Sequence, residues 1–195
     1  MLDTVNLNPP SILKDIEEAT QSIGFTMGSD HQTGSLLRTL ATAKPSGNFL
    51  ELGTGTGLSA AWLLDGMDAH SRLITVDRNE THTAIARRFL GHDSRLTFVT
   101  MDGVGFIDSM REQEKTFDFI FADMQPGKYQ HLDETLQLLA PGGLYVVDDL
   151  LMSSSWEEAH LTRVYHLIST LEKRADLRVT KLNWSVGLMI AAKVG

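Results

Sequence analysis

The sequence predicts a doubly wound α/β fold, in which helices cover both faces of a mostly parallel sheet. Short apolar, β-branched runs alternate with helical periodicity along most of the 195 residues. A glycine-rich loop follows the first of these runs. The last two runs are joined by a link too short for a crossover, so we expect them to pair antiparallel. These observations predict a seven-stranded sheet with an antiparallel last strand.

The expected strands share short runs rich in Val, Ile, Leu, Phe and Thr. In chain order they are residues 49–52, 72–77, 95–100, 117–121, 144–147, 177–182 and 186–192.

Helical spacing of apolar residues fills most of the links between these strands. The expected helices are residues 11–22, 32–43, 58–64, 103–110, 129–139 and 156–173, together with one that follows the strand at 72–77 and runs through about Leu90. The helix over 129–139 rests on Leu132, Leu136 and Leu139, and we expect the Pro-Gly-Gly run at 141–143 to end it.

The composition is typical of one globular domain over residues 1–195, with a helical appendage at 1–45 and an α/β core at 46–195. A net charge of −8 disfavours nucleic acid as a partner, and no apolar run is long enough to span a membrane. The absence of Cys excludes disulfides and thiolate metal sites. Because the N-terminus resembles no secretory signal, we expect a cytoplasmic protein.

The loop from Glu51 to Ser59 lies where the first strand meets its helix, and it carries glycines in a GxGxG pattern. Such loops let the backbone approach a ligand closely. Leu58 occupies the place of the third glycine of a dinucleotide fingerprint, and the lysine of a phosphate-binding P-loop is absent. Since the Glu51 carboxylate would repel a pyrophosphate, the loop favours a cationic or hydroxyl-rich ligand.

Two further acids follow the next strands. Asp77 ends the second strand, where its carboxylate can accept both hydroxyls of a ribose, and Asp102 follows the third, suitably placed for an adenine amino group. Each acid alone is equally consistent with a helix N-cap. In register with the glycine loop, they favour a nucleoside site.

Asp123, Asp148 and Asp149 follow the fourth and fifth strands. A hard cation would relieve the repulsion among three carboxylates, and oxygen ligands suit Mg²⁺, with Ca²⁺ or Mn²⁺ as alternatives. The other interpretation is that Asp148 and Asp149 cap a helix start at 153–156, while Asp123 contacts the cofactor or a backbone amide.

From residue 27 onward the chain resembles the class I S-adenosylmethionine-dependent methyltransferases, and more narrowly the small cation-dependent O-methyltransferases of the caffeoyl-CoA and catechol type. The motifs that carry the resemblance are MGSDHQTG at 27–34, ELGTGTGLS at 51–59, ITVD at 74–77, FDFIFAD at 117–123, Tyr129, VVDD at 146–149 and the closing strand around Gly187.

The resemblance implies a Rossmann-like methyltransferase fold and a homodimer. It also implies an S-adenosylmethionine-dependent O-methyltransferase that acts on a small hydroxylated acceptor, with aromatic molecules among the candidates. It implies catalytic roles for Asp123 and Lys128 and a cation, Mg²⁺ first, held by Asp123, Asp148 and Asp149. The implied cofactor contacts are Met27, Ser29, Glu51, Gly53, Thr54, Gly55, Gly57, Ser59, Asp77, Arg78, Asp102, Gly103 and Asp123.

Three residues depart from the pattern of the resembled family. Asp149 replaces an Asn metal ligand, Gln125 replaces an Asp, and Pro126 stands where catechol-type enzymes carry a lysine that takes the acceptor proton. Lys128 lies two residues further on, which leaves the assignment of the base open.

Two alternatives stay open from the residues alone. An NAD-dependent oxidoreductase shares the sheet and the ribose acid, although Leu58 and Glu51 disfavour it. A non-catalytic nucleoside-binding protein would keep the crevice and lose the transfer chemistry, which Pro126 and Asp149 would permit.

Overall fold

A single sheet organises the chain. The computed structural model describes residues 2–5, 7–151 and 157–195. Within these residues the strands are β1 (Asn48–Leu52), β2 (Arg72–Asp77), β3 (Leu96–Thr100), β4 (Phe117–Ala122), β5 (Leu139–Val147), β6 (Leu177–Leu182) and β7 (Leu188–Lys193). Their spatial order is β3-β2-β1-β4-β5-β7-β6.

The strand directions confirm the expected fold class. Strands β1 to β5 pair in parallel with their neighbours, and β7 runs antiparallel between β5 and β6. The chain moves outward from β1 to β3 and then crosses back to β4 on the other side of β1. In such sheets ligands bind outside the carboxyl ends of the strands at this reversal.

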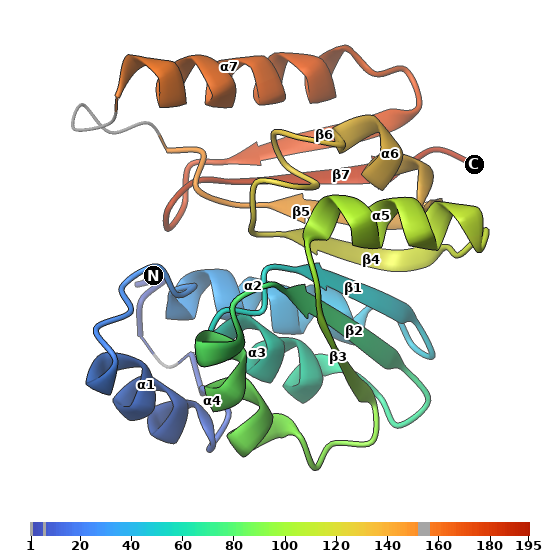
Figure 1. The fold of residues 1–195 in the computed structure, drawn as a ribbon. Coiled ribbons are helices and arrows are strands. Elements are labelled where there is room, and N and C mark those ends of the chain that lie inside the picture. The colour runs from blue at the N-terminus through green and yellow to red at the C-terminus, as the bar shows by residue number, and fades with distance from the viewer. Residues whose placement is uncertain (1, 6, 152–156) are drawn as a thin grey trace.

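Helices cover both faces of the sheet. They are α1 (Leu13–Ser22), α2 (His31–Thr42), α3 (Leu58–Gly66), α4 (Glu80–Leu90), α5 (Gly103–Glu112), α6 (Leu132–Gln137) and α7 (Glu158–Lys173). Figure 1 shows α1 to α4 on one side of the sheet and α5 to α7 on the other. None of the described helices combines the length and apolar character needed to cross a membrane.

Successive side chains of the strands point to opposite faces of the sheet and pack into two apolar cores. Along β1, Leu50 and Leu52 face the core beneath α5 to α7, whereas Phe49 faces the core beneath α1 to α4. Leu13 of α1 and Leu37 of α2 are fully buried in this second core. The predicted N-terminal appendage therefore joins this core, where α2 packs against α3 and α1 packs against α4 and α3.

The helix predicted over residues 129–139 is wrong at both ends. Tyr129 lies in a turn, where its N–H donates to the carbonyl of Gln125 (2.9 Å), and helix α6 begins only after His131, whose φ is 54°. Leu139 already belongs to β5, where it pairs with Phe117. The strand thus starts five residues before the predicted Leu144, because pairing to β4 outweighs the helical spacing of the leucines.

Helix α7 matches its prediction from Glu158 to Lys173. The predicted start at Trp156 lies outside the described residues, as does the helix start at 153–156 that Asp148 and Asp149 would cap in the alternative interpretation.

Candidate active site

A cavity of about 900 Å³ opens at the carboxyl ends of the parallel strands, where the reversal of strand order predicts a ligand site. The sequence-predicted residues that line it are Met27, Ser29, Gly53, Thr54, Gly55, Ser59, Asp77, Arg78, Asp102, Asp123, Lys128, Asp148 and Asp149. Glu51, Gly57 and Gly103 are not among the lining residues.

The glycine loop packs against the chain that leaves β4. Gly53 has a φ of +110°, and a Cβ there would stand 2.5 Å from the carbonyl oxygen of Asp123. Gly57, with a φ of +94°, presses against Ala86 of α4, where a Cβ would approach to 2.8 Å. Gly53 therefore allows the loop to lie against Asp123, which lines the cavity, whereas Gly57 allows it to pack closely against helix α4.

Glu51 lies beneath the glycine loop and is fully buried. Its Oε2 accepts a hydrogen bond from Thr75 (2.5 Å), whose hydroxyl in turn contacts that of Thr54 in the loop (2.6 Å). Burial raises the pKa of Glu51 to about 7, and the hydroxyls of Thr75 and nearby Ser59 oppose this shift. Its Oε1 has no hydrogen-bond partner among the described residues. The structure thus makes Glu51 a support of the loop instead of a group lining the cavity.

Asp77 ties the loop to the second strand. Its Oδ2 accepts the N–H of Gly55 and its Oδ1 accepts the N–H of Asn79, both at 2.9 Å. Each carboxylate oxygen has a second acceptor position. Because Asn79 is the N-cap of α4, the capping interpretation does not apply to Asp77.

Asp102 does cap a helix. It is the N-cap of α5, and its Oδ2 accepts the N–H groups of Val104 (3.0 Å) and Gly105 (3.3 Å). It also lines the cavity, so the capping and ligand-binding interpretations of this acid are compatible.

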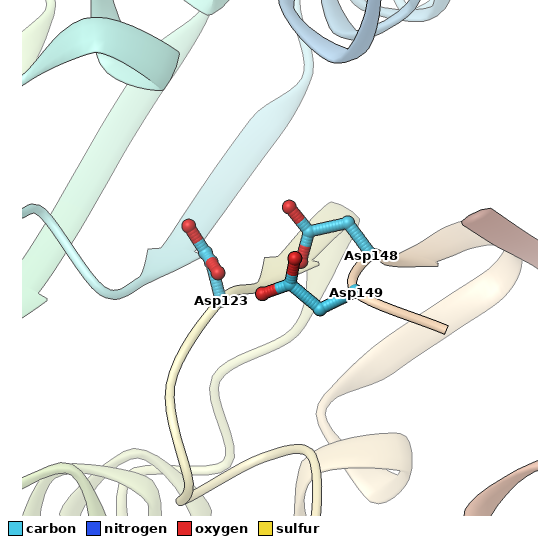
Figure 2. A group of neighbouring side chains, drawn as sticks. All are labelled: Asp123, Asp148 and Asp149. Atoms are coloured by element: carbon cyan, nitrogen blue, oxygen red, sulfur yellow. The ribbon is translucent and has the colours of Figure 1, made fainter. Parts of the chain in front are cut away.

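The three acids after β4 and β5 converge, as the sequence predicted. Figure 2 shows Asp123, Asp148 and Asp149 with their carboxylates turned toward one another, and one oxygen of each lies within 4.8 Å of the others. Asp149 has a φ of 55°, the left-handed turn that lets two consecutive residues point into one site. Ser29, from the segment before α2, donates to Asp123 (3.4 Å).

Lys128 lies among these carboxylates. Its Nζ is 3.1 Å from Asp148 Oδ1, 3.9 Å from Asp149 Oδ2 and 4.0 Å from Asp123 Oδ1. Only 4% of the residue is exposed. Burial lowers the pKa of the ammonium, but the three carboxylates outweigh burial and raise that pKa above its usual value. This raised pKa favours the protonated ammonium of Lys128 near neutral pH.

The pKa of Asp123 is shifted in the same acidic end of the cavity. Burial is the largest cause, and the charge of Asp148 adds to it, so the pKa of Asp123 lies well above its usual value despite the attraction of Lys128.

Several lining residues were not predicted as site residues. They are Phe25, Asn79, His82, Gln125, Tyr129 and His160, among others. Phe25 and His82 face each other with ring centroids 4.4 Å apart, and both line the cavity. In the sequence, only their closeness to predicted site residues could have indicated them. Phe25 lies two residues before Met27, and His82 lies one helical turn past the cap at Asn79.

Comparison with known proteins places these features in a family. A model of the O-methyltransferase family matches residues 4–193. A catechol O-methyltransferase of Niastella koreensis is 30% identical over 123 residues, which cover 60% of this chain and 56% of the relative. The match thus spans little more than half of that relative's length.

Solved structures share the fold at low sequence identity. An O-methyltransferase from Bacillus cereus in complex with SAH superposes with a TM-score of 0.85 at 19% identity, covering 98% of this chain and 94% of that one. TomG from Streptomyces achromogenes, an O-methyltransferase of tomaymycin synthesis in complex with SAM, gives 0.85 at 20% identity, covering 99% and 94%. With a family match over nearly its whole length, the chain belongs to the O-methyltransferase family.

Proposed function

We propose that the protein is an S-adenosylmethionine-dependent O-methyltransferase that methylates a hydroxyl group of a small acceptor, with aromatic hydroxyls as the first candidates. The observation that carries this proposal is one continuous cavity. Its lining runs from Asp77 at the end of β2 and Asp102 after β3, past the glycine loop, to Asp123 after β4 and Asp148 after β5. The end of the cavity near Asp77 and Asp102 would bind the donor, and the end near Asp123 and Asp148 would hold the reacting hydroxyl.

The residues present suit an adenosyl donor. Asp77 has acceptor positions left for ribose hydroxyls beside the close-packed glycine loop, and Phe25 and His82 offer ring faces beside it. Neighbouring strands lie about 4.8 Å apart, so the ends of β2 and β4, separated by β1, are about 10 Å apart. This spacing separates the adenosine end from the acidic end.

When bound, the donor supplies a methyl group on a positively charged sulfur. In the transfer, an acceptor oxygen forms a C–O bond to that methyl carbon, the C–S bond breaks with its electron pair going to sulfur, and the hydroxyl proton leaves. The protein's contribution is alignment of the two reacting groups and removal of the proton. Asp123 lines the cavity between the glycine loop and Lys128, and we assign it the acceptance of that proton.

The divalent cation expected from the sequence is not part of this proposal. Three carboxylate oxygens within 4.8 Å of one another suit a cation, but an ammonium already lies 3.1–4.0 Å from all three acids. Mg²⁺ needs oxygen ligands at about 2.1 Å, and Lys128 offers only donors and a like charge. The side chains, as arranged, do not fit a divalent ion.

Methyl transfer from labelled S-adenosylmethionine to a panel of phenols and catechols tests the function directly. We expect a methylated product together with S-adenosylhomocysteine, and a large loss of both in Asp123→Asn. Donor binding without transfer to any acceptor would favour the non-catalytic alternative, and enhanced fluorescence of bound NADH would favour the oxidoreductase.

A further inference from the structure

We propose that the ammonium of Lys128 is the resident cation of this acidic site and takes the place of a divalent metal ion. In this proposal the positive charge of Lys128 offsets the mutual repulsion of the carboxylates of Asp123, Asp148 and Asp149. Its consequence for catalysis rests on the proposed methyl transfer, whereas its consequence for metal binding does not.

The first step is the position of the ammonium. Lys128 Nζ lies 3.1, 3.9 and 4.0 Å from one oxygen each of Asp148, Asp149 and Asp123. A metal ion bound by the same three acids would have to share this space with the ammonium. Two positive charges a few ångströms apart in a largely buried site repel each other strongly. The ammonium and a divalent ion therefore compete for the same carboxylates.

The second step is the anchoring of the lysine. The N–H groups of Lys128, Tyr129 and Gln130 all donate to the carbonyl of Gln125, forming a tight turn. Gly127, with a φ of +87°, packs against Leu52, where a Cβ would stand 2.4 Å from the leucine side chain.

The buried hydroxyl of Tyr145 donates to the carbonyl of Gly127 (2.7 Å) and fixes this turn to β5. Packing against Leu52 and the hydrogen bond from Tyr145 thereby hold the backbone at Gly127, just before Lys128. The lysine side chain thus extends toward the three acids from a well-anchored turn.

The third step is the unused donor capacity of the ammonium. Among the described residues, Lys128 Nζ makes one side-chain hydrogen bond, to Asp148, while its contacts with Asp123 and Asp149 are longer. An ammonium has three N–H donors. One of the others can bind an acceptor oxygen at the cavity wall and stabilise the negative charge that grows there as the proton passes to Asp123. The C–O bond then forms as the C–S bond breaks.

Metal binding tests the inference without any need for turnover. Calorimetric titration of the full chain with Mn²⁺ alone should show weak binding to the wild type and at least about tenfold tighter binding to Lys128→Met, in which three carboxylates lose their cation. Lys115→Met, at an exposed lysine on the far loop, is the matched control and should bind as the wild type does. Equal Mn²⁺ affinity in the wild type and Lys128→Met would overturn the proposal.

A second variant covers the possibility that Lys128→Met does not fold. Lys128→Arg keeps the positive charge and should bind Mn²⁺ as weakly as the wild type does. Mn²⁺ binding to the wild type itself in about the micromolar range would contradict the proposal whatever the variants do.

The catalytic consequence has its own readout. Methyl transfer by the wild type should change by less than about twofold when EDTA replaces added Mg²⁺, whereas Lys128→Met should lose activity and regain part of it with Mg²⁺. Loss of wild-type activity in EDTA, with recovery on adding Mg²⁺, would refute Lys128 as the resident cation. If the protein transferred no methyl group at all, the proposed function would fail, and the Mn²⁺ titration would still decide this inference.

Discussion

The buried carboxyl of Glu51 offers a quantitative test of the site's architecture. It sits under the glycine loop, fully buried, with one oxygen bonded to Thr75 and the other without a partner among the described residues. Burial raises its pKa from 4.5 to about 7, and the hydroxyls of Thr75 and nearby Ser59 oppose this shift. Between these two pH values the folded protein holds a proton that the unfolded chain has lost. Stability therefore falls as pH rises through this window.

The size of the effect follows from the pKa change. At about 1.4 kcal/mol for each pH unit between the two pKa values, ionisation of Glu51 lowers the free energy of unfolding by about 3 kcal/mol above pH 7. Glu51→Gln has the shape of the protonated acid and carries no titrating proton. We expect its stability relative to the wild type to increase by about 3 kcal/mol between pH 4.5 and pH 8.

Urea unfolding of the donor-free protein at several pH values measures this difference, since such a change moves the midpoint by about 1–2 M. Glu112→Gln, at an exposed position near the end of α5, is the control and should leave the pH profile unchanged. Parallel pH profiles for the wild type and Glu51→Gln would refute the assignment of Glu51 as a buried, proton-holding support.

Three further substitutions test other parts of the site. Asp77→Asn should weaken S-adenosylhomocysteine binding about 10–100-fold in calorimetry, because the carboxylate holds Gly55 and faces the cavity. Gly53→Ala should cost about 1–3 kcal/mol in urea unfolding, since its Cβ would meet backbone at 2.5 Å, and unchanged stability would contradict this packing. Asp30→Ala should remove the α2 cap at a cost of about 1 kcal/mol. Burial raises the pKa of Asp30, but hydrogen bonds from Ser185 and Thr33 outweigh it, so the cap's contribution should be present above pH 3.8 and lost in thermal unfolding as pH falls below it.

The sheet could be predicted closely from the sequence because its strands are short, buried and bounded by turns. The predicted strand at 72–77 has the observed bounds of β2, and 117–121 differs from β4 by one residue. The leucines at 132, 136 and 139 misled because a helix and a buried strand both place leucine in the core, and the spacing does not show which one Leu139 joins.

The sequence predicted both the acids and Lys128 as site residues, but not the contact of Lys128 with all three acids. Asp123, Asp148 and Asp149 converge because neighbouring parallel strands end at one edge of the sheet. The position of Lys128 depends on the turn around Gly127 and its bond from Tyr145, which no residue spacing reveals. The position of Glu51 was equally hidden from the sequence. An acid at the end of a strand can face the ligand or lie beneath the loop that holds the ligand.

The central claim is that this cavity binds an adenosyl donor of methyl groups. Calorimetric titration of the full chain with S-adenosylhomocysteine tests it most directly. We predict saturable binding at one site, with a dissociation constant of about 1–100 μM, that weakens in Asp77→Asn. Absence of any binding heat at about 1 mM ligand from a folded protein would contradict the claim.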